Sequence, residues 1–191
     1  IVAVVVGLFA ISEMTLQMLK RDLLKVPNVT VARPGFRTIS RTLKHYVNLV
    51  RSSAIGTFFG AIPGAGGVIS SFTSYAIAKA SSKPGEKYGE GEEGGVVATE
   101  SANNATVGGT LVPTLSLGIP GDASSAMLLG ALLILGFIPG PAMFENNPDV
   151  VGGIFMVYLL SNVFLLIAGI LATPLFVYVL RIPKVYLLSL I

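Results

Sequence analysis

The chain has 191 residues, of which 52% are hydrophobic and only 12% are charged, and its mean hydropathy is +0.77. Charged residues make up about a quarter of an ordinary soluble domain, so this composition argues against that class and favours an integral membrane protein. The formal charge of +3, the absence of cysteine and a single histidine, His45, argue against a nucleic-acid surface, a disulfide framework and a histidine-based catalytic or metal site.

Residues 1–19 are predicted to be the end of a transmembrane helix. They are apolar from Ile1 to Ile11 and then keep a helical pattern, but a full span needs about 20 residues. The last segment, residues 181–191, also ends inside an apolar run. We therefore expect the chain to be a fragment of a longer membrane protein.

Residues 20–51 are predicted to be a basic segment on the cytoplasmic side of the membrane. Eight of the thirteen lysines and arginines lie here, against a single acidic residue, and such an excess is typical of cytoplasmic loops. From Phe36 onwards, apolar and basic side chains fall on opposite faces of a helix. This pattern predicts an amphipathic helix in the headgroup plane, although a helix packed on a soluble partner would have the same pattern.

Residues 52–80 contain two short apolar arms separated by the break Pro63-Gly64-Ala65-Gly66-Gly67. Each arm reaches about 20 Å, which is less than the hydrocarbon core of about 30 Å. A single bent span and a re-entrant hairpin both fit this pattern. Residues 81–99 carry further lysines and are predicted to be a cytoplasmic loop, so both ends of the element lie on one side and we favour the hairpin.

Residues 100–138 form the element around which the chain is organised. Two apolar runs, each too short to cross a bilayer, meet at Gly118-Ile119-Pro120-Gly121-Asp122. Proline removes a backbone donor and glycine loosens the helix, and lipid tolerates unwound backbone only where protein buries it or water reaches it. The break therefore predicts a midplane binding site in a broken transmembrane helix. A proline kink without a ligand is the simpler alternative.

The remaining segments complete the predicted topology. Residues 139–149 carry acidic but no basic residues and are predicted to be an external loop. Residues 150–180 are uncharged and long enough for one transmembrane helix, and residues 181–191 return the chain to the cytoplasm before the next helix begins. With these sides assigned, residues 100–138 cross the membrane once, rather than forming a second hairpin.

Five motifs stand in order along the chain: Gly7–Glu13, Ile62–Gly67, Glu100–Ala105, Leu115–Gly121 and Gly136–Pro141. In this order they resemble the C-terminal part of the large membrane subunit of the tripartite tricarboxylate transporters. The resemblance implies a multi-pass secondary transporter of the bacterial inner membrane, driven by an ion gradient and not an enzyme. It also implies two partners, an extracytoplasmic solute-binding protein and a small four-helix membrane subunit, and carboxylate substrates such as citrate.

We therefore expect an all-α integral membrane protein. Its transmembrane helices should accompany a re-entrant helical hairpin and a broken helix, and together they should form half of an inverted-repeat secondary transporter. We expect no catalytic residues, and no cofactor or metal beyond a coupling ion, Na⁺ or H⁺. The alternative is a structural or assembly subunit whose broken helices only pack.

The predicted site lies where the two breaks expose helix N-termini and unwound carbonyls, which suit a carboxylate and a cation respectively. The residues predicted to bind substrate are Gly64, Ala65, Gly66, Gly67, Ser116, Gly118, Pro120, Gly121 and Ser124. The residues predicted to couple the ion are Asn103, Asn104, Thr114 and Asp122. Asp122 has an alternative role as the N-cap of a helix from Ala123, and the two asparagines fit equally well at a helix N-terminus at the membrane interface.

Overall fold

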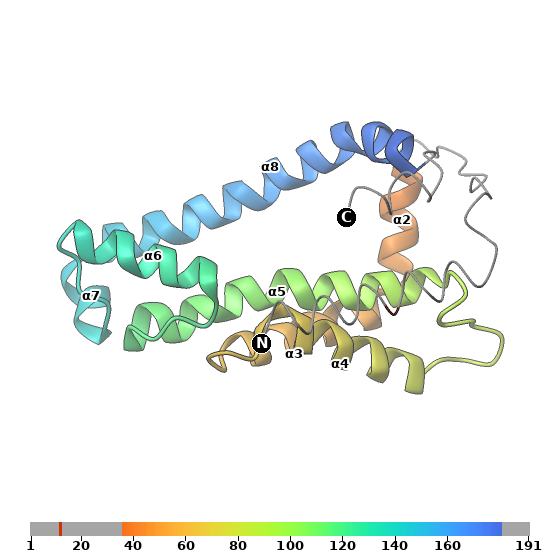
Figure 1. Ribbon diagram of the computed structural model, residues 1–191, viewed down its shortest axis with the longest axis horizontal. Helices are drawn as coiled ribbons and strands as arrows, with labels where there is room; N and C mark the ends of the chain where they lie inside the picture. Colours follow the sequence, from red (N-terminus) through yellow and green to blue (C-terminus); the bar gives the residue numbers. More distant parts are fainter. Residues whose placement is uncertain (1–11, 13–35, 181–191) are drawn as a thin grey trace. The chain divides into compact units, whose positions relative to one another are not determined.

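The structure is a computed structural model that describes Ser12 and residues 36–180. The predicted helix end at 1–19, apart from Ser12, the first part of the basic segment and the final segment 181–191 lie outside the described residues. The described residues form helices and no strand, as expected for an all-α protein (Figure 1). The helices are α2 Phe36–Lys44, α3 Tyr46–Gly60, α4 Gly66–Ala80, α5 Glu93–Leu117, α6 Ala123–Ile134, α7 Pro141–Asn146 and α8 Pro148–Leu180.

The chain divides into two compact units, and all the predicted site residues belong to the one that spans Gly35–Leu160. The second unit contains the remainder of α8 from Ser161 onwards. The helix α8 has 33 residues and contains Pro174. Among the described residues, its portion Pro148–Tyr178 is the one helix long and apolar enough to cross a membrane, and α6 is apolar but shorter.

Helices α3 and α4 form a hairpin with a turn at Ala61-Ile62-Pro63-Gly64-Ala65. Each arm has 15 residues and is therefore about 22 Å long. Gly64 and Gly66 have φ of 82° and 67°, a left-handed backbone that L side chains adopt only with strain. The pair of helices joined by a short turn agrees with the predicted hairpin, whereas the position of this hairpin in a membrane stays a prediction.

The predicted amphipathic helix is divided at His45, so that its second half is the beginning of α3 rather than part of a separate surface helix. The reason is a set of contacts that the sequence pattern does not contain. The Asn48 side chain donates to Tyr88 Oη at 3.1 Å and to the Gly94 carbonyl at 3.2 Å. These bonds hold the first turns of α3 against the beginning of α5.

Both arms of the hairpin lie along α5 (Figure 1), and the helices meet through small residues spaced four apart. The buried residues of this interface are Ser52, Gly56 and Gly60 on α3, Ser70, Ser74 and Ala78 on α4, and Ala98, Ala102, Thr106, Thr110 and Thr114 on α5. Residues four apart share one helix face, and small ones let two backbones approach closely. A Cβ atom on Gly56 would lie 2.1 Å from the Ala102 carbonyl oxygen, so no side chain fits there.

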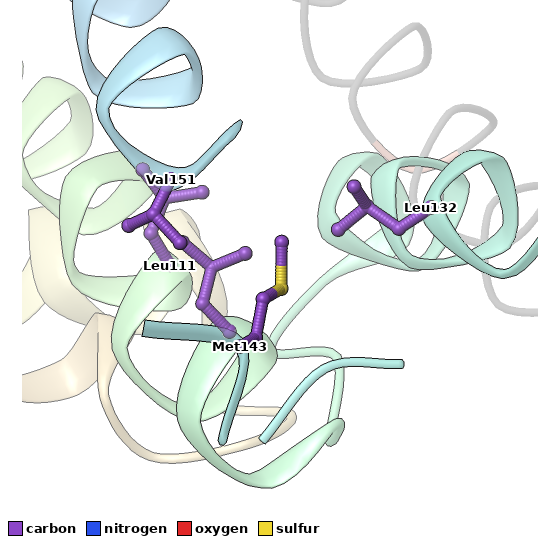
Figure 2. Packing of buried hydrophobic residues seen from close by; sticks show 5 residues of the cluster. Leu111, Leu132, Met143 and Val151 are labelled. Atoms are coloured by element: carbon purple, nitrogen blue, oxygen red, sulfur yellow. The ribbon is translucent and has the colours of Figure 1, made fainter. Parts of the chain in front are cut away.

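A separate apolar cluster holds the far end of α5. Leu111 and Leu115 of α5 pack with Leu132 of α6, Met143 of α7 and Val151 of α8, all of them buried (Figure 2). Most other large apolar side chains in the part of the chain that the structure describes are exposed, including Phe58 on α3 and Phe72 on α4. Small residues inside and large apolar residues outside are the arrangement expected of helices that face lipid.

Candidate functional site

The two predicted breaks lie in direct contact. The Gly64 N–H in the hairpin turn donates to the Gly121 carbonyl between α5 and α6, with a nitrogen–oxygen distance of 3.1 Å. Gly121 is buried, and a Cβ atom on it would lie 2.8 Å from Thr110 Cγ2 and 3.2 Å from the Gly60 carbonyl oxygen. The absence of a side chain at Gly121 therefore allows the two turns to meet. This contact joins the two groups of residues predicted to bind substrate.

The second break closes over the end of α5. Gly118 takes a left-handed conformation with φ of 65°, and the next N–H, that of Ile119, donates back to the Pro113 carbonyl at 3.2 Å. This is a common way for a helix to end at glycine. The Gly140 N–H donates to the Leu115 carbonyl at 2.8 Å, which brings the Pro139-Gly140 turn to the last turn of α5.

Asp122 has a structural role in the break. Its Oδ1 accepts from the Ser125 N–H at 2.7 Å, and its own N–H donates to Ser125 Oγ at 2.9 Å. The two residues thus form a reciprocal capping box at the beginning of α6, which satisfies backbone donors that the helix leaves free. The N-cap interpretation therefore fits the structure, and an ion-coupling role would be additional to it.

The hydroxyl groups near the break mostly bond within their own helix. Thr114 is fully buried, and its hydroxyl donates to the Thr110 carbonyl at 2.6 Å while lying 3.5 Å from the Ile119 carbonyl. The half-buried Ser116 donates back to the Val112 carbonyl. Such bonds use the hydroxyl proton and leave oxygen lone pairs free. Ser124 is exposed on the first turn of α6.

The predicted asparagine pair is separated. Asn103 lies beside the N-terminus of α4, because its Oδ1 would be 2.5 Å from a Cβ atom on Gly67. Asn104 bonds elsewhere: its side-chain nitrogen donates to the Glu100 carbonyl at 2.9 Å, and its own carbonyl accepts from Tyr158 Oη at 3.3 Å. The structure thus brings Asn103 to the hairpin and leaves Asn104 on the side of α5 that contacts α8.

The two helices that begin at the contact differ in their capping. Helix α6 carries the Asp122 carboxylate at its N-terminus, whereas α4 begins after Ala65 with no side-chain cap and no acidic residue in its first turn. Ala65 and Gly66 at the beginning of α4 are half-buried, and no side chain accepts a hydrogen bond from the first backbone N–H groups of this helix. A helix N-terminus carries partial positive charge, so α4 is the better end for an anion.

One further polar pair was not predicted from the sequence. Ser70 Oγ and Thr106 Oγ1 lie 2.6 Å apart, both buried where α4 crosses α5, and they also approach the Gly67 carbonyl at 2.9 Å and the Ala102 carbonyl at 2.8 Å respectively. The signal that would have found them is the spacing of four between small residues in Ser70-Ser74-Ala78 and Ala102-Thr106-Thr110.

Comparison with known proteins places the chain in a family. The family model described as the tripartite tricarboxylate transporter TctA family matches residues 1–191. The chain belongs to this family. The TctA family is a family of transporters, which supports a membrane location.

Two curated relatives from Agrobacterium vitis are similar to this TctA family chain. One is described as an uncharacterized 52.8 kDa protein in the TAR-I ttuC' 3' region, and it is 32% identical over 187 residues, which cover 95% of the chain and 36% of the relative. The other is described as an uncharacterized protein in the TAR-II ttuC' 3' region. It is 37% identical over 128 residues, 67% of the chain and 53% of the relative. The chain thus spans about a third and about half of the length of these relatives. No solved structure matches it.

Proposed function

We propose that the chain forms part of the permease subunit of a secondary transporter that uses an ion gradient to take up tricarboxylates or related citrate-like carboxylates. The transporter would act in the bacterial inner membrane, together with an extracytoplasmic solute-binding protein and a small four-helix membrane subunit. The observation that carries this proposal is the hydrogen bond between Gly64 and Gly121, because it places two interrupted backbones side by side.

In this proposal the substrate carboxylate binds at the N-terminus of α4. The uncapped N–H groups near Gly66 and Gly67 supply donors, and the Asn103 side chain lies beside them. No lysine or arginine lies in either break, so binding relies on backbone and amide groups. The N-terminus of α6 is a poorer anion site, because the Asp122 carboxylate already occupies it.

The coupling cation would bind on the other side of the contact. Asp122 supplies negative charge. The Thr114 hydroxyl oxygen and the Ile119 carbonyl oxygen lie 3.5 Å apart, and both residues are close to Asp122 in the sequence. Hard cations such as Na⁺ prefer oxygen ligands of this kind. A cation here and a carboxylate at α4 would offset each other's charge across the Gly64–Gly121 contact, which gives a physical basis for coupled binding.

The close packing of small residues favours movement of the hairpin and α5 as one body. Cβ atoms on Gly60 and Gly109 would lie 2.3 Å and 2.5 Å from backbone oxygens of the opposite helix. Helices packed this closely cannot slide gradually past one another, so they would move together. The site would therefore pass intact from one side of the membrane to the other.

A substitution at Gly66 tests the substrate site. Gly66 has φ of 67° and open space around it, so Gly66→Ala adds backbone strain of about 1–2 kcal/mol and covers the exposed donors without a steric clash. Gly85→Ala is the control, since Gly85 also has positive φ and open space but lies in the loop before α5. We expect citrate uptake by the full protein to fall at least tenfold in the first variant and to persist in the second. Wild-type uptake by Gly66→Ala would favour the structural or assembly role.

A further inference from the structure

A polar cavity of about 270 Å³ lies at the end of the hairpin remote from the Gly64 turn. It is formed by the junction of α2 with α3, the end of α4 and the loop that leads to α5. Its charged lining consists of Lys44, Arg51, Lys83 and Glu86. Three cations thus face one carboxylate, although these residues come from distant parts of the sequence.

The Glu86 carboxylate is already engaged. Its Oε2 accepts from the Lys83 backbone N–H at 3.0 Å, in a short loop structure rather than in an ion pair with the lysine side chain. The ion pairs that the structure gives within residues 36–180 are Arg41–Glu93 and Lys87–Glu90, and neither involves a cation of the cavity. The cavity therefore keeps an excess of positive charge.

Arg51 is held in place by two neutral side chains. Its Nη1 donates to Ser81 Oγ at 2.6 Å and its Nη2 to Asn48 Oδ1 at 2.7 Å, so neutral groups fix the guanidinium without neutralising it. Its Nε is buried and has no hydrogen-bond partner among the described residues. Each terminal nitrogen carries two N–H groups and donates one of them to these neutral partners, so the second N–H of each can donate to an anion.

The cavity adjoins an apolar surface. Tyr46 and Val47 belong to its lining and are 65% and 55% exposed, and the exposed apolar side chains Ile39 and Leu43 lie just before them on α2. Cations beside exposed apolar side chains suit an amphiphile whose anionic head enters the cavity and whose hydrocarbon lies against the helix.

We propose that this cavity binds a phosphate group, through Lys44, Arg51 and Lys83. Guanidinium and ammonium groups together are the usual ligands of phosphate oxygens. A phospholipid headgroup and free phosphate both supply this chemistry, and the adjoining apolar surface favours the lipid. The inference goes beyond the proposed transport function, because the cavity is separate from the Gly64–Gly121 site.

The test uses the full protein in phosphatidylcholine nanodiscs that contain phosphatidic acid, with retained lipid measured by native mass spectrometry. The cavity variant is Lys44→Gln with Lys83→Gln, and the control is Lys79→Gln with Lys87→Gln, which removes the same charge from exposed lysines outside the cavity. We expect phosphatidic acid retention to fall at least tenfold in the cavity variant and less than twofold in the control. Arg51→Gln is a second, independent cavity variant.

Calorimetric titration of the delipidated protein with inorganic phosphate distinguishes the two sources. Phosphate binding that the cavity variant abolishes, without preferential retention of phosphatidic acid, would assign the cavity to the free ion. Equal losses in the cavity and control variants would overturn the proposal, as would the absence of binding by both probes.

Discussion

Gly121→Ala is the sharpest perturbation of the contact between the two breaks. The new methyl carbon would lie 2.8 Å from Thr110 Cγ2, 2.9 Å from Thr110 Cβ and 3.2 Å from the Gly60 carbonyl oxygen. Carbon atoms in ordinary contact are about 3.5–4.0 Å apart, so the break must move away from α5 by roughly 0.7–1 Å. Overpacking of this size costs about 1–3 kcal/mol.

This displacement is large enough to break the hydrogen bond between Gly64 and Gly121. The Gly64 nitrogen and the Gly121 oxygen are 3.1 Å apart, and an added 0.7–1 Å would take them to roughly 4 Å, where no hydrogen bond remains. We therefore expect Gly121→Ala to insert and fold, with a lowered unfolding temperature, and to lose most of its citrate uptake in proteoliposomes.

Gly130→Ala is the matched control. Gly130 lies in α6, its backbone is helical, and nothing lies within 4 Å of a Cβ atom there. The same substitution should therefore leave uptake unchanged and stabilise the helix slightly, by up to about 1 kcal/mol. Wild-type uptake by Gly121→Ala, at normal expression, would refute the reasoning that the contact between the turns forms the site.

Three further sets of substitutions test other parts of the account. Gly56→Ala directs a methyl group at the Ala102 backbone, where a Cβ atom would lie 2.1 Å from the carbonyl oxygen, so we expect more than about 3 kcal/mol of destabilisation and little folded protein in a thermal unfolding assay. Asp122→Asn keeps an N-cap, so the unfolding temperature should be unchanged while the ion dependence of uptake is lost. Asp122→Ala should lose the ion dependence and also cost about 1 kcal/mol of stability. Unaltered ion dependence in both variants would restrict Asp122 to capping. Ser70→Ala and Thr106→Val should each cost about 1 kcal/mol, and strict additivity in the double variant would show that the 2.6 Å hydroxyl pair does not couple the helices.

The two breaks could be predicted from local sequence, whereas α5 begins at Glu93, inside the predicted loop 81–99, and α7 lies inside the predicted loop 139–149. Pro63 and Pro120 remove backbone donors, and the neighbouring glycines tolerate left-handed backbone, so the position of each break follows from chemistry within a few residues. The order of five short motifs was enough to indicate the family, which the comparison then showed.

The contacts between elements could not be predicted in the same way. Asn48 holds the second half of the amphipathic segment against α5, because it bonds to Tyr88 and the Gly94 carbonyl, which only the folded chain brings near. Asn103 and Asn104 are adjacent in sequence, yet the Asn103 side chain lies beside α4 while the Asn104 side chain bonds back to Glu100, because neighbouring residues on a helix point about 100° apart. The interface of small residues does leave a sequence signal, but its period of four is masked by the apolar residues that surround it.

Solvent access at Ser116 tests the central claim, that the touching breaks form an aqueous site for a carboxylate and a cation. The chain contains no cysteine, so Ser116→Cys in an otherwise cysteine-free full protein gives a single thiol at the break. The measurement is its labelling by a membrane-impermeant thiol reagent, with and without Na⁺ and citrate. The account predicts labelling that Na⁺ and citrate suppress. A thiol that never labels from either side, or that labels equally under every condition, would contradict it.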